Sequence, residues 1–196
     1  EQALKNVFLH LKKVRHGSRL ALPSMGWDHY FTMAKDCNVR IRHYNYERKK
    51  FEFSLNKSSI LHLLNEKVDA LLIGSPVNPL GSSISHKDQM SFSKKLMPDG
   101  YMIIDETYHG FANDKHSTKQ KIHDMPNSII VRSFSKFYGL AGIRIGYVVC
   151  GDKAREFMEH CRVYLGMNTL SEMLGMMCIK KHKEFVKYAT TIKNER

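Results

Sequence analysis

Residues 69–81 read DALLIGSPVNPLG, and they set the pattern for the whole chain. Asp69–Gly74 is a continuous apolar stretch, which is typical of a strand that is covered on both faces of a sheet. The residues that follow are rich in Pro, Asn and Gly, which end strands and form turns. The stretch therefore predicts a buried strand that opens into a polar loop.

The same alternation extends in both directions from this stretch. Strands are predicted over Arg19–Leu22, Asn38–Tyr44, Tyr101–Ile104, Ser128–Arg132 and Ile145–Val149, with a short extended piece at Phe51 and Phe53. Apolar residues at helical spacing predict helices over residues 3–14, 27–35, 60–65, 87–97, 152–164, 170–181 and 183–196. The helix over 60–65 is expected to be capped by Ser58 or Ser59. Helices that alternate with buried strands predict an α/β fold, with a largely parallel sheet between helices.

The composition is that of a globular protein. The 196 residues are 42% hydrophobic and 26% charged, which excludes a disordered or collagen-like chain. No apolar run approaches the ~20 residues of a membrane helix, so we expect no membrane partner. The four cysteines form no C-x-x-C pair, which favours free thiols in a reducing, cytoplasmic compartment over a zinc site or a disulfide scaffold.

The chain is basic, with a formal net charge of +12. Nucleic-acid binding, a preference for phosphorylated ligands and a lysine-rich proteome would each account for that charge. The lysines are scattered along the chain and form no stripe with aromatic residues, so we expect no nucleic-acid partner. His109, His116 and His123 are evenly spaced, but no cysteine pair or carboxylate spacing completes a site, so we expect no metal.

Three polar clusters follow predicted strands: Asn78, Asp105–Tyr108, and Ser133–Arg144. In sheets of this class, ligands bind outside the carboxyl ends of the strands. Lys136 lies in the third cluster, among aromatic, small and apolar neighbours. Desolvation and nearby cations lower the pKa of a lysine, and a neutral amine is what a Schiff-base lysine needs. Serine hydroxyls and the guanidinium of Arg144 suit a phosphate dianion.

Residues 133–146, SFSKFYGLAGIRIG, resemble the pyridoxal-phosphate lysine motif of the class I/II aminotransferases, which have fold type I. The motif is small-x-Ser-Lys-x-x-Gly-Leu-x-Gly-x-Arg-x-Gly, and this chain matches it at every defined position. The resemblance implies that Lys136 holds pyridoxal 5'-phosphate as a Schiff base and then moves the proton of the substrate. It implies that Ser133, Ser135 and Arg144 anchor the phosphate.

The other two clusters fit the same family. Asp105-Glu106-Thr107-Tyr108 matches its Asp-Glu-x-Tyr motif, and Asn78-Pro79-Leu80-Gly81 matches its Asn-Pro-x-Gly loop, with Leu where Thr is usual. The resemblance implies that Asp105 keeps the pyridine nitrogen of the cofactor protonated, so that the ring acts as an electron sink. Tyr108 and Asn78 would donate hydrogen bonds to its phenolic oxygen. Asp105 and Tyr108 therefore join Lys136 as expected catalytic residues.

The family usually places an aromatic residue over the cofactor ring. The corresponding position here holds Met25, so the stacking residue would be Trp27 or Tyr30. The equally plain reading is that Trp27 packs against the helix that follows it.

The resemblance implies a three-layer α/β/α domain whose mostly parallel sheet has about seven strands. Residues 1–182 would be the cofactor-binding large domain, without the phosphate-cradling segment expected before Glu1. Residues 183–196 would begin the helix that leads to a small C-terminal domain outside this chain. The family's site lies between subunits, so we expect a homodimer.

The expected reaction is transfer of an amino group between an amino acid and a 2-oxo acid, in the style of histidinol-phosphate aminotransferase-like members. Two alternatives stay open. Decarboxylases and C–S lyases of the same fold share these motifs. A non-catalytic, basic binding module is the alternative outside enzymes.

Overall fold

The computed structural model describes residues 1–112, 118–161 and 166–195. Its main sheet has six strands in the order β2-β1-β5-β6-β7-β8. Their bounds are Arg19–Pro23 (β1), Arg40–Tyr44 (β2), Ala70–Gly74 (β5), Tyr101–Asp105 (β6), Ser128–Ser133 (β7) and Gly146–Cys150 (β8). Neighbouring strands are parallel, except that β8 runs antiparallel to β7. The predicted, mostly parallel α/β sheet is confirmed.

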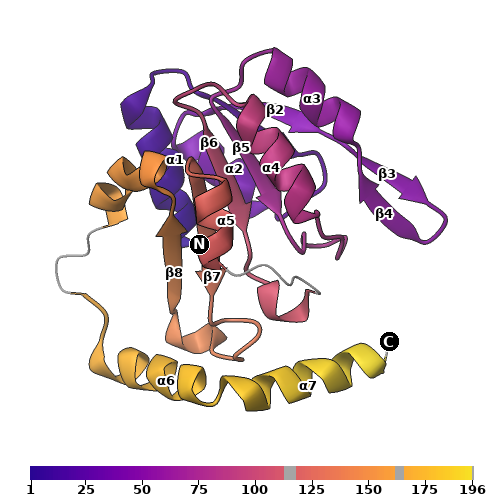
Figure 1. Cartoon of the computed structure of the whole chain (residues 1–196). Helices are drawn as coiled ribbons and strands as arrows, with labels where there is room; N and C mark the ends of the chain where they lie inside the picture. The colour runs from indigo at the N-terminus through magenta and orange to yellow at the C-terminus, as the bar shows by residue number, and fades with distance from the viewer. Residues whose placement is uncertain (113–117, 162–165, 196) are drawn as a thin grey trace.

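Over the described residues this sheet has six strands, where the resemblance implied about seven, and the extended piece around Phe51 does not join it. That piece lies in an antiparallel hairpin formed by β3 (Tyr46–Lys49) and β4 (Glu52–Leu55). The hairpin projects from the body of the molecule (Figure 1), and Phe51 at its turn is 94% exposed.

Helices cover both faces of the sheet. One core cluster gathers side chains from the sheet, α1 (Gln2–Val14), α2 (His29–Asp36) and the 3₁₀ helix η3 (Asp152–Cys161). The other joins the opposite face to α3 (Lys57–Asn65), α4 (His86–Lys95) and α5 (Thr118–Asp124). In β5, Ala70 and Leu72 belong to the first cluster, whereas Leu71 and Ile73 belong to the second. This period of two, with all four side chains buried, makes β5 an interior strand.

The start of α3 differs from the prediction. The side chain of Asn56 accepts a hydrogen bond from the backbone N–H of Ser59 at 2.9 Å, so Asn56 caps the helix. The prediction of Ser58 or Ser59 as the cap was wrong. α4 begins in the same way, with Ser85 accepting from the N–H of Asp88.

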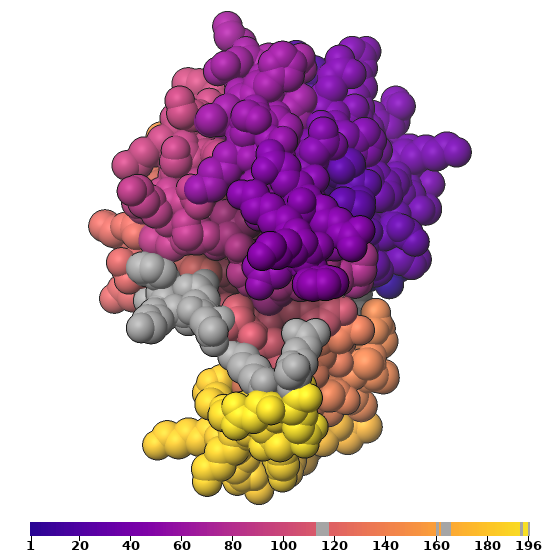
Figure 2. Space-filling view, turned by 90° about the vertical axis from the view of Figure 1, so that its right-hand side faces the viewer, coloured from indigo at the N-terminus to yellow at the C-terminus, as the bar shows by residue number. Residues whose placement is uncertain are grey.

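The C-terminal helices lie beyond the carboxyl edge of the sheet. α6 (Thr169–Lys180) and α7 (His182–Asn194) form a rod there (Figure 1), and the space-filling view shows their residues gathered at one end of the molecule (Figure 2). A small core of Phe134, Ile145 and Cys178 attaches this rod to the loops of the sheet. Many apolar side chains of the rod stay exposed, among them Leu170, Met173, Met177, Ile179, Tyr188 and Ile192.

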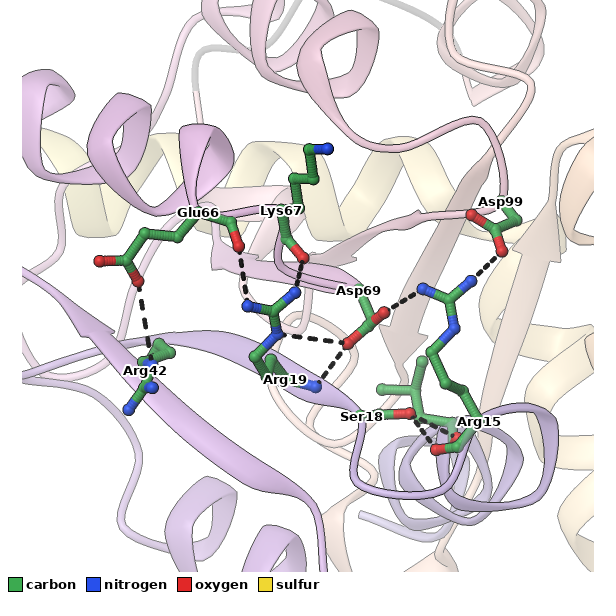
Figure 3. Close-up of polar contacts among 9 residues, drawn as sticks. Arg15, Ser18, Arg19, Arg42, Glu66, Lys67, Asp69 and Asp99 are labelled. Carbon is green, nitrogen blue, oxygen red and sulfur yellow. Dashed lines mark hydrogen bonds and ion pairs between the residues drawn. The ribbon is translucent and has the colours of Figure 1, made fainter.

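The opposite, amino edge of the sheet carries a network of paired charges centred on Asp69 (Figure 3). The carboxylate of Asp69 accepts the backbone N–H of Arg19 at 2.7 Å and the guanidinium of Arg15, which also pairs with Asp99. These contacts join the end of α1 to the first residues of β1 and β5. A depression of about 340 Å³ lies beside them, lined by Asp69, Asp99, Tyr101 and Lys153 among others. Because Asp69 and Asp99 are both paired with Arg15, we assign this edge a structural role.

Candidate active site

The three predicted clusters emerge side by side at the carboxyl edge of the sheet. The strands end in register, with Gly74 beside Asp105 and Asp105 beside Val131. Backbone hydrogen bonds continue past the strand ends, from Ser75 N to Asp105 O at 2.9 Å and from Glu106 N to Val131 O at 2.8 Å. The loops that carry Asn78, Tyr108 and Lys136 therefore leave from three adjacent strands. The sequence predicted that each of them follows a strand.

Asp105 ends β6 with a buried carboxylate. Its Oδ2 accepts a hydrogen bond from the hydroxyl of Tyr30 in α2 at 2.5 Å. Its Oδ1 accepts two hydrogen bonds from Thr107, from the backbone N–H at 3.0 Å and from the hydroxyl at 2.7 Å. An ionised carboxylate has about four lone-pair sites, so Asp105 can accept one more donor.

Tyr30 is a protonated donor in this pair. Burial, followed by the charge of Asp105, raises the pKa of the Tyr30 hydroxyl well above its ordinary value. Sequence reasoning considered Tyr30 only as a ring that stacks on the cofactor. The contact with Asp105 joins residues 75 positions apart, and no local motif signals it.

Lys136 and Tyr108 lie close together. The Nζ of Lys136 is 5.7 Å from the centroid of the Tyr108 ring, within the range of a cation–π contact. The side chain of Lys136 is exposed, although its neighbours in sequence are aromatic, small or apolar. The aromatic residues around it pack against other parts of the protein and leave the amine open to a ligand.

Aromatic residues that follow Lys136 pack its loop against neighbouring segments. The ring of Phe137 meets Phe111 edge-on at 5.9 Å and lies directly against Gly110. The hydroxyl of Tyr138 is 2.9 Å from Nδ1 of His182 in α7. The loops of Tyr108 and Lys136 are thus packed on each other, although the sequence motifs treat them separately.

Of the residues expected at the phosphate, Arg144 lies beside the start of α1. The backbone N–H of Ser135 donates to the hydroxyl oxygen of Ser133 at 3.0 Å, which leaves the Ser133 proton free to donate. Arg144 has a positive φ of 60° and donates to the carbonyl of Ala141 at 2.9 Å. Its guanidinium also lies 3.7 Å from the carboxylate of Glu1, the N-cap residue of α1. A helix start and an arginine both favour an anion at such a place.

Asn78 lies on the loop after β5, with its side chain exposed. A backbone hydrogen bond from Gly81 N to Val77 O, 2.7 Å long, closes the turn that contains it. In the part of the chain that the structure describes, no hydrogen bond joins the Asn78 side chain to Asp105, Tyr108 or Lys136.

A buried charge cluster follows Asp105. The carboxylate of Glu106 is fully buried and pairs with Lys121, which is itself 0% exposed. It also accepts from Nε of Arg132 at 2.8 Å, and Nδ1 of His109 lies 3.6 Å away. Taken alone, Asp105-Glu106 would have suggested a solvated strand end, so this cluster was missed. It ties the turn between Asp105 and Tyr108 to β7 and α5.

The candidate stacking residues pack on each other. Trp27 meets the ring of Tyr30 edge-on at 5.6 Å and lies 4.8 Å from the ring of His29. Met25 is 39% exposed. These contacts favour the reading in which Trp27 packs against the following helix.

His116 of the evenly spaced histidines lies outside the described residues. His109 contacts Glu106, and His123 is exposed. Over the described ranges, no group of three or more His, Cys, Asp or Glu side chains is placed to hold a metal ion. No helix of the described chain is long and apolar enough to cross a membrane.

Comparison with known sequences identifies a family. The family model for aminotransferase class I and II matches residues 2–191. The histidinol-phosphate aminotransferase of Methanocaldococcus jannaschii is 27% identical over 172 residues, which cover 88% of this chain and 45% of that protein. Its namesake in Brevibacillus brevis is 32% identical over 126 residues, covering 63% of this chain and 34% of that protein. The chain spans less than half the length of these curated relatives.

Solved structures share the fold. The histidinol-phosphate aminotransferase from Clostridium acetobutylicum superposes with a TM-score of 0.84 at 22% identity, covering 99% of this chain and 57% of that chain. A pyridoxal-phosphate-bound C–S lyase from Staphylococcus hominis superposes with a TM-score of 0.80 at 11% identity. The match covers 95% of this chain and 49% of that chain. The architecture is therefore common to enzymes that are named for different reactions.

Proposed function

This chain belongs to the class I and II aminotransferases, and from that membership we propose that the protein transfers an amino group between an amino acid and a 2-oxo acid, using pyridoxal 5'-phosphate. The observation that carries the proposal is the pairing of two features at one edge of the sheet. Asp105 is a buried carboxylate with room for one more donor, and Lys136 on a nearby loop is an exposed amine beside Tyr108.

The donor set fits the cofactor chemically. A carboxylate suits a protonated pyridine nitrogen, and hydroxyls with a guanidinium suit a phosphate. Asp105 would hold the proton on the ring nitrogen, and Tyr108 and Asn78 would donate to the phenolic oxygen. Ser133, Ser135 and Arg144 would bind the phosphate. When bound, the cofactor supplies an electron sink that makes the Cα–H bond of the substrate acidic.

Lys136 would act twice in this scheme. Its amine would hold the cofactor covalently until an incoming amine displaces it. The freed amine would then accept the Cα proton of the substrate and return it to the C4′ carbon of the cofactor, as a general base and acid. The exposed position of Lys136 supports both roles, because each requires access to a ligand.

The names of the relatives make histidinol phosphate the first amino donor to test.

We further propose that the protein is a cytoplasmic homodimer, that residues 1–182 form its cofactor-binding domain and that residues 183–196 begin a linker helix. Cys37, Cys150, Cys161 and Cys178 are all free thiols, which supports a reducing compartment. The exposed apolar side chains of α6 and α7 support an interface on that rod.

Absorption spectroscopy tests the cofactor and its lysine. We expect the purified full-length protein to gain a visible absorption band with pyridoxal phosphate, and borohydride to remove that band. The Lys136→Ala variant should lack the band, because no other lysine among the described residues belongs to the candidate site. Lys153→Ala is the matched control and should keep it, since Lys153 lines the depression at the opposite edge.

A wild-type protein without a visible band would contradict the cofactor proposal and favour a non-catalytic binding module. A Lys136→Ala variant that keeps a reducible band would contradict the assignment of the lysine.

The shared fold of a C–S lyase keeps a second reaction class in view. A screen of amino acids for 2-oxo-acid formation, carbon dioxide release and sulfide release distinguishes the classes. Transamination predicts at most one equivalent of 2-oxo acid per site without an acceptor, and continued formation only when an acceptor 2-oxo acid is present. Release of carbon dioxide or sulfide without an acceptor would instead assign a decarboxylase or a lyase.

A further inference from the structure

The carboxylate of Asp105 is held from two sides by residues outside the family motifs' catalytic positions. Tyr30 reaches Oδ2 from α2, and Thr107 occupies Oδ1 from the turn after β6. We propose that Tyr30 and Thr107 are positioning residues that fix the orientation of Asp105, and that they leave Oδ2 as the oxygen that receives the ring nitrogen of the cofactor. This inference rests on the proposed function.

The number of hydrogen bonds that each oxygen of Asp105 accepts shows which of the two can receive the ring nitrogen. Each oxygen of an ionised carboxylate has about two lone-pair sites. Oδ1 accepts both the backbone N–H and the hydroxyl of Thr107, at 3.0 Å and 2.7 Å, which uses its two sites. Oδ2 accepts Tyr30 alone, at 2.5 Å, among the contacts of the described residues. One lone pair of Oδ2 is therefore open to a further donor.

Tyr30 is itself rigidly placed. It is 3% exposed, belongs to the core cluster on the α1–α2 face, and meets Trp27 edge-on. Burial and then Asp105 raise its pKa, so the hydroxyl keeps its proton and stays a donor. A buried ring cannot swing away from the carboxylate, and Asp105 cannot rotate about χ2 without breaking bonds on both oxygens.

The loss of one side of this arrangement has a defined consequence. Without the Tyr30 hydroxyl, the carboxylate keeps only its contacts to Thr107, and Oδ2 is free to turn or to bind water. A hydrogen bond to a charged group corresponds to about a 10- to 100-fold change in an equilibrium constant. We expect that change in the affinity for the cofactor.

The experiment compares Tyr30→Phe with Tyr44→Phe in the full-length protein. Both substitutions remove one hydroxyl from a buried tyrosine, since Tyr44 is 0% exposed and donates to the carbonyl of Leu72 at 2.9 Å. Of these two tyrosines, only Tyr30 donates a hydrogen bond to Asp105. The probe is pyridoxal phosphate added to apoprotein, and the readouts are its dissociation constant and the visible circular dichroism induced in the bound cofactor. Thermal unfolding without cofactor reports the structural cost of each variant.

We expect Tyr30→Phe to weaken cofactor binding about 10- to 100-fold and to reduce the induced dichroism, whereas Tyr44→Phe keeps both within about two-fold. Thr107→Val, which preserves side-chain shape on a half-buried turn, should weaken binding in the same direction. This second variant tests the arrangement even where Tyr30→Phe does not fold.

Three outcomes would overturn the inference. If Tyr30→Phe and Thr107→Val lower the unfolding temperature yet bind cofactor like the wild type, both residues are purely structural. If Tyr44→Phe weakens binding as much as Tyr30→Phe, the effect is general to the core. A wild-type protein that binds no pyridoxal phosphate would reject the proposed function itself, and the inference with it.

Discussion

Gly110 and Phe137 show how single residues join two loops of the candidate site. A β-carbon placed at position 110 would meet the ring of Phe137 at 2.0 Å, far inside van der Waals contact. Phe137 directly follows Lys136. The absence of a side chain at Gly110 therefore sets how closely the loop of Tyr108 approaches the loop of Lys136.

We predict that Gly110→Ala lowers the free energy of unfolding by about 1–3 kcal/mol, because the added methyl group displaces the ring of Phe137. Urea unfolding measures the change. Gly142→Ala is the matched control: its β-carbon would meet nothing within 4 Å, so we expect an effect within about 0.5 kcal/mol. Equal losses in the two variants would show that the contact with Phe137 does not matter.

At the residue scale, the sequence predicted what lies in contiguous motifs. It placed Asn78, Asp105, Tyr108 and Lys136 after strand ends, and the structure has them on adjacent loops. The contacts that hold Asp105 and Glu106 could not be predicted in this way. They join Tyr30 to Asp105 and Lys121 to Glu106 through the packing of separate helices, which no spacing in the sequence records.

Among the secondary-structure elements, the start of α3 shows the limit of sequence patterns. Three polar residues near it, Asn56, Ser58 and Ser59, are all good caps, and composition does not choose between them. The extended geometry of Asn56, with φ at −76° and ψ at 95°, decides the matter. The hairpin strand β3 was missed for a related reason: Tyr46–Lys49 is charged and has no apolar alternation.

We predict that Asn56→Ala destabilises the protein by about 1 kcal/mol, since the N–H of Ser59 loses its side-chain acceptor. The comparison is Ser58→Ala, which removes a hydroxyl that donates to the same Oδ1 of Asn56 at 2.6 Å. It leaves that oxygen in place to accept the N–H of Ser59, so it should cost less than about 0.5 kcal/mol. Chemical unfolding of both variants gives the answer. A larger loss in Ser58→Ala would restore Ser58 as the cap.

For the whole molecule, the two apolar clusters on opposite faces of the sheet dominate the fold. The alternation of helices and buried strands was enough to predict this three-layer arrangement. The pairing of the extended piece around Phe51 was not predictable, because a short extended piece can pair either with the sheet or with its neighbour in sequence. Tyr44 and Tyr46 both belong to the second cluster. Because both hydroxyls are buried, we expect the free energy of unfolding to fall at alkaline pH, where these groups would ionise.

Burial raises the pKa of Tyr46 from 10.0 to about 12. Its contribution to stability is therefore complete below about pH 10, where the unfolded chain is also protonated, and is lost as the pH rises toward 12. We predict that Tyr46→Phe reduces the alkaline loss of unfolding free energy by about 2–3 kcal/mol over this range.

Urea unfolding at several alkaline pH values measures this effect. Tyr188→Phe serves as the control, because Tyr188 is 67% exposed and should leave the alkaline loss unchanged. An alkaline loss in Tyr46→Phe equal to that of the wild type would contradict the prediction.

The network around Asp69 has a practical consequence for work with this protein. It occupies the amino edge of the sheet, whereas Asp105 and the loops of the candidate site occupy the carboxyl edge. The backbone carbonyl of Lys67 accepts a hydrogen bond from the guanidinium of Arg19, whereas the side chain of Lys67 is exposed and its amine makes no contact in that network (Figure 3). A fluorophore or a tether to a sensor chip attached at Lys67 would therefore leave the candidate site facing solution.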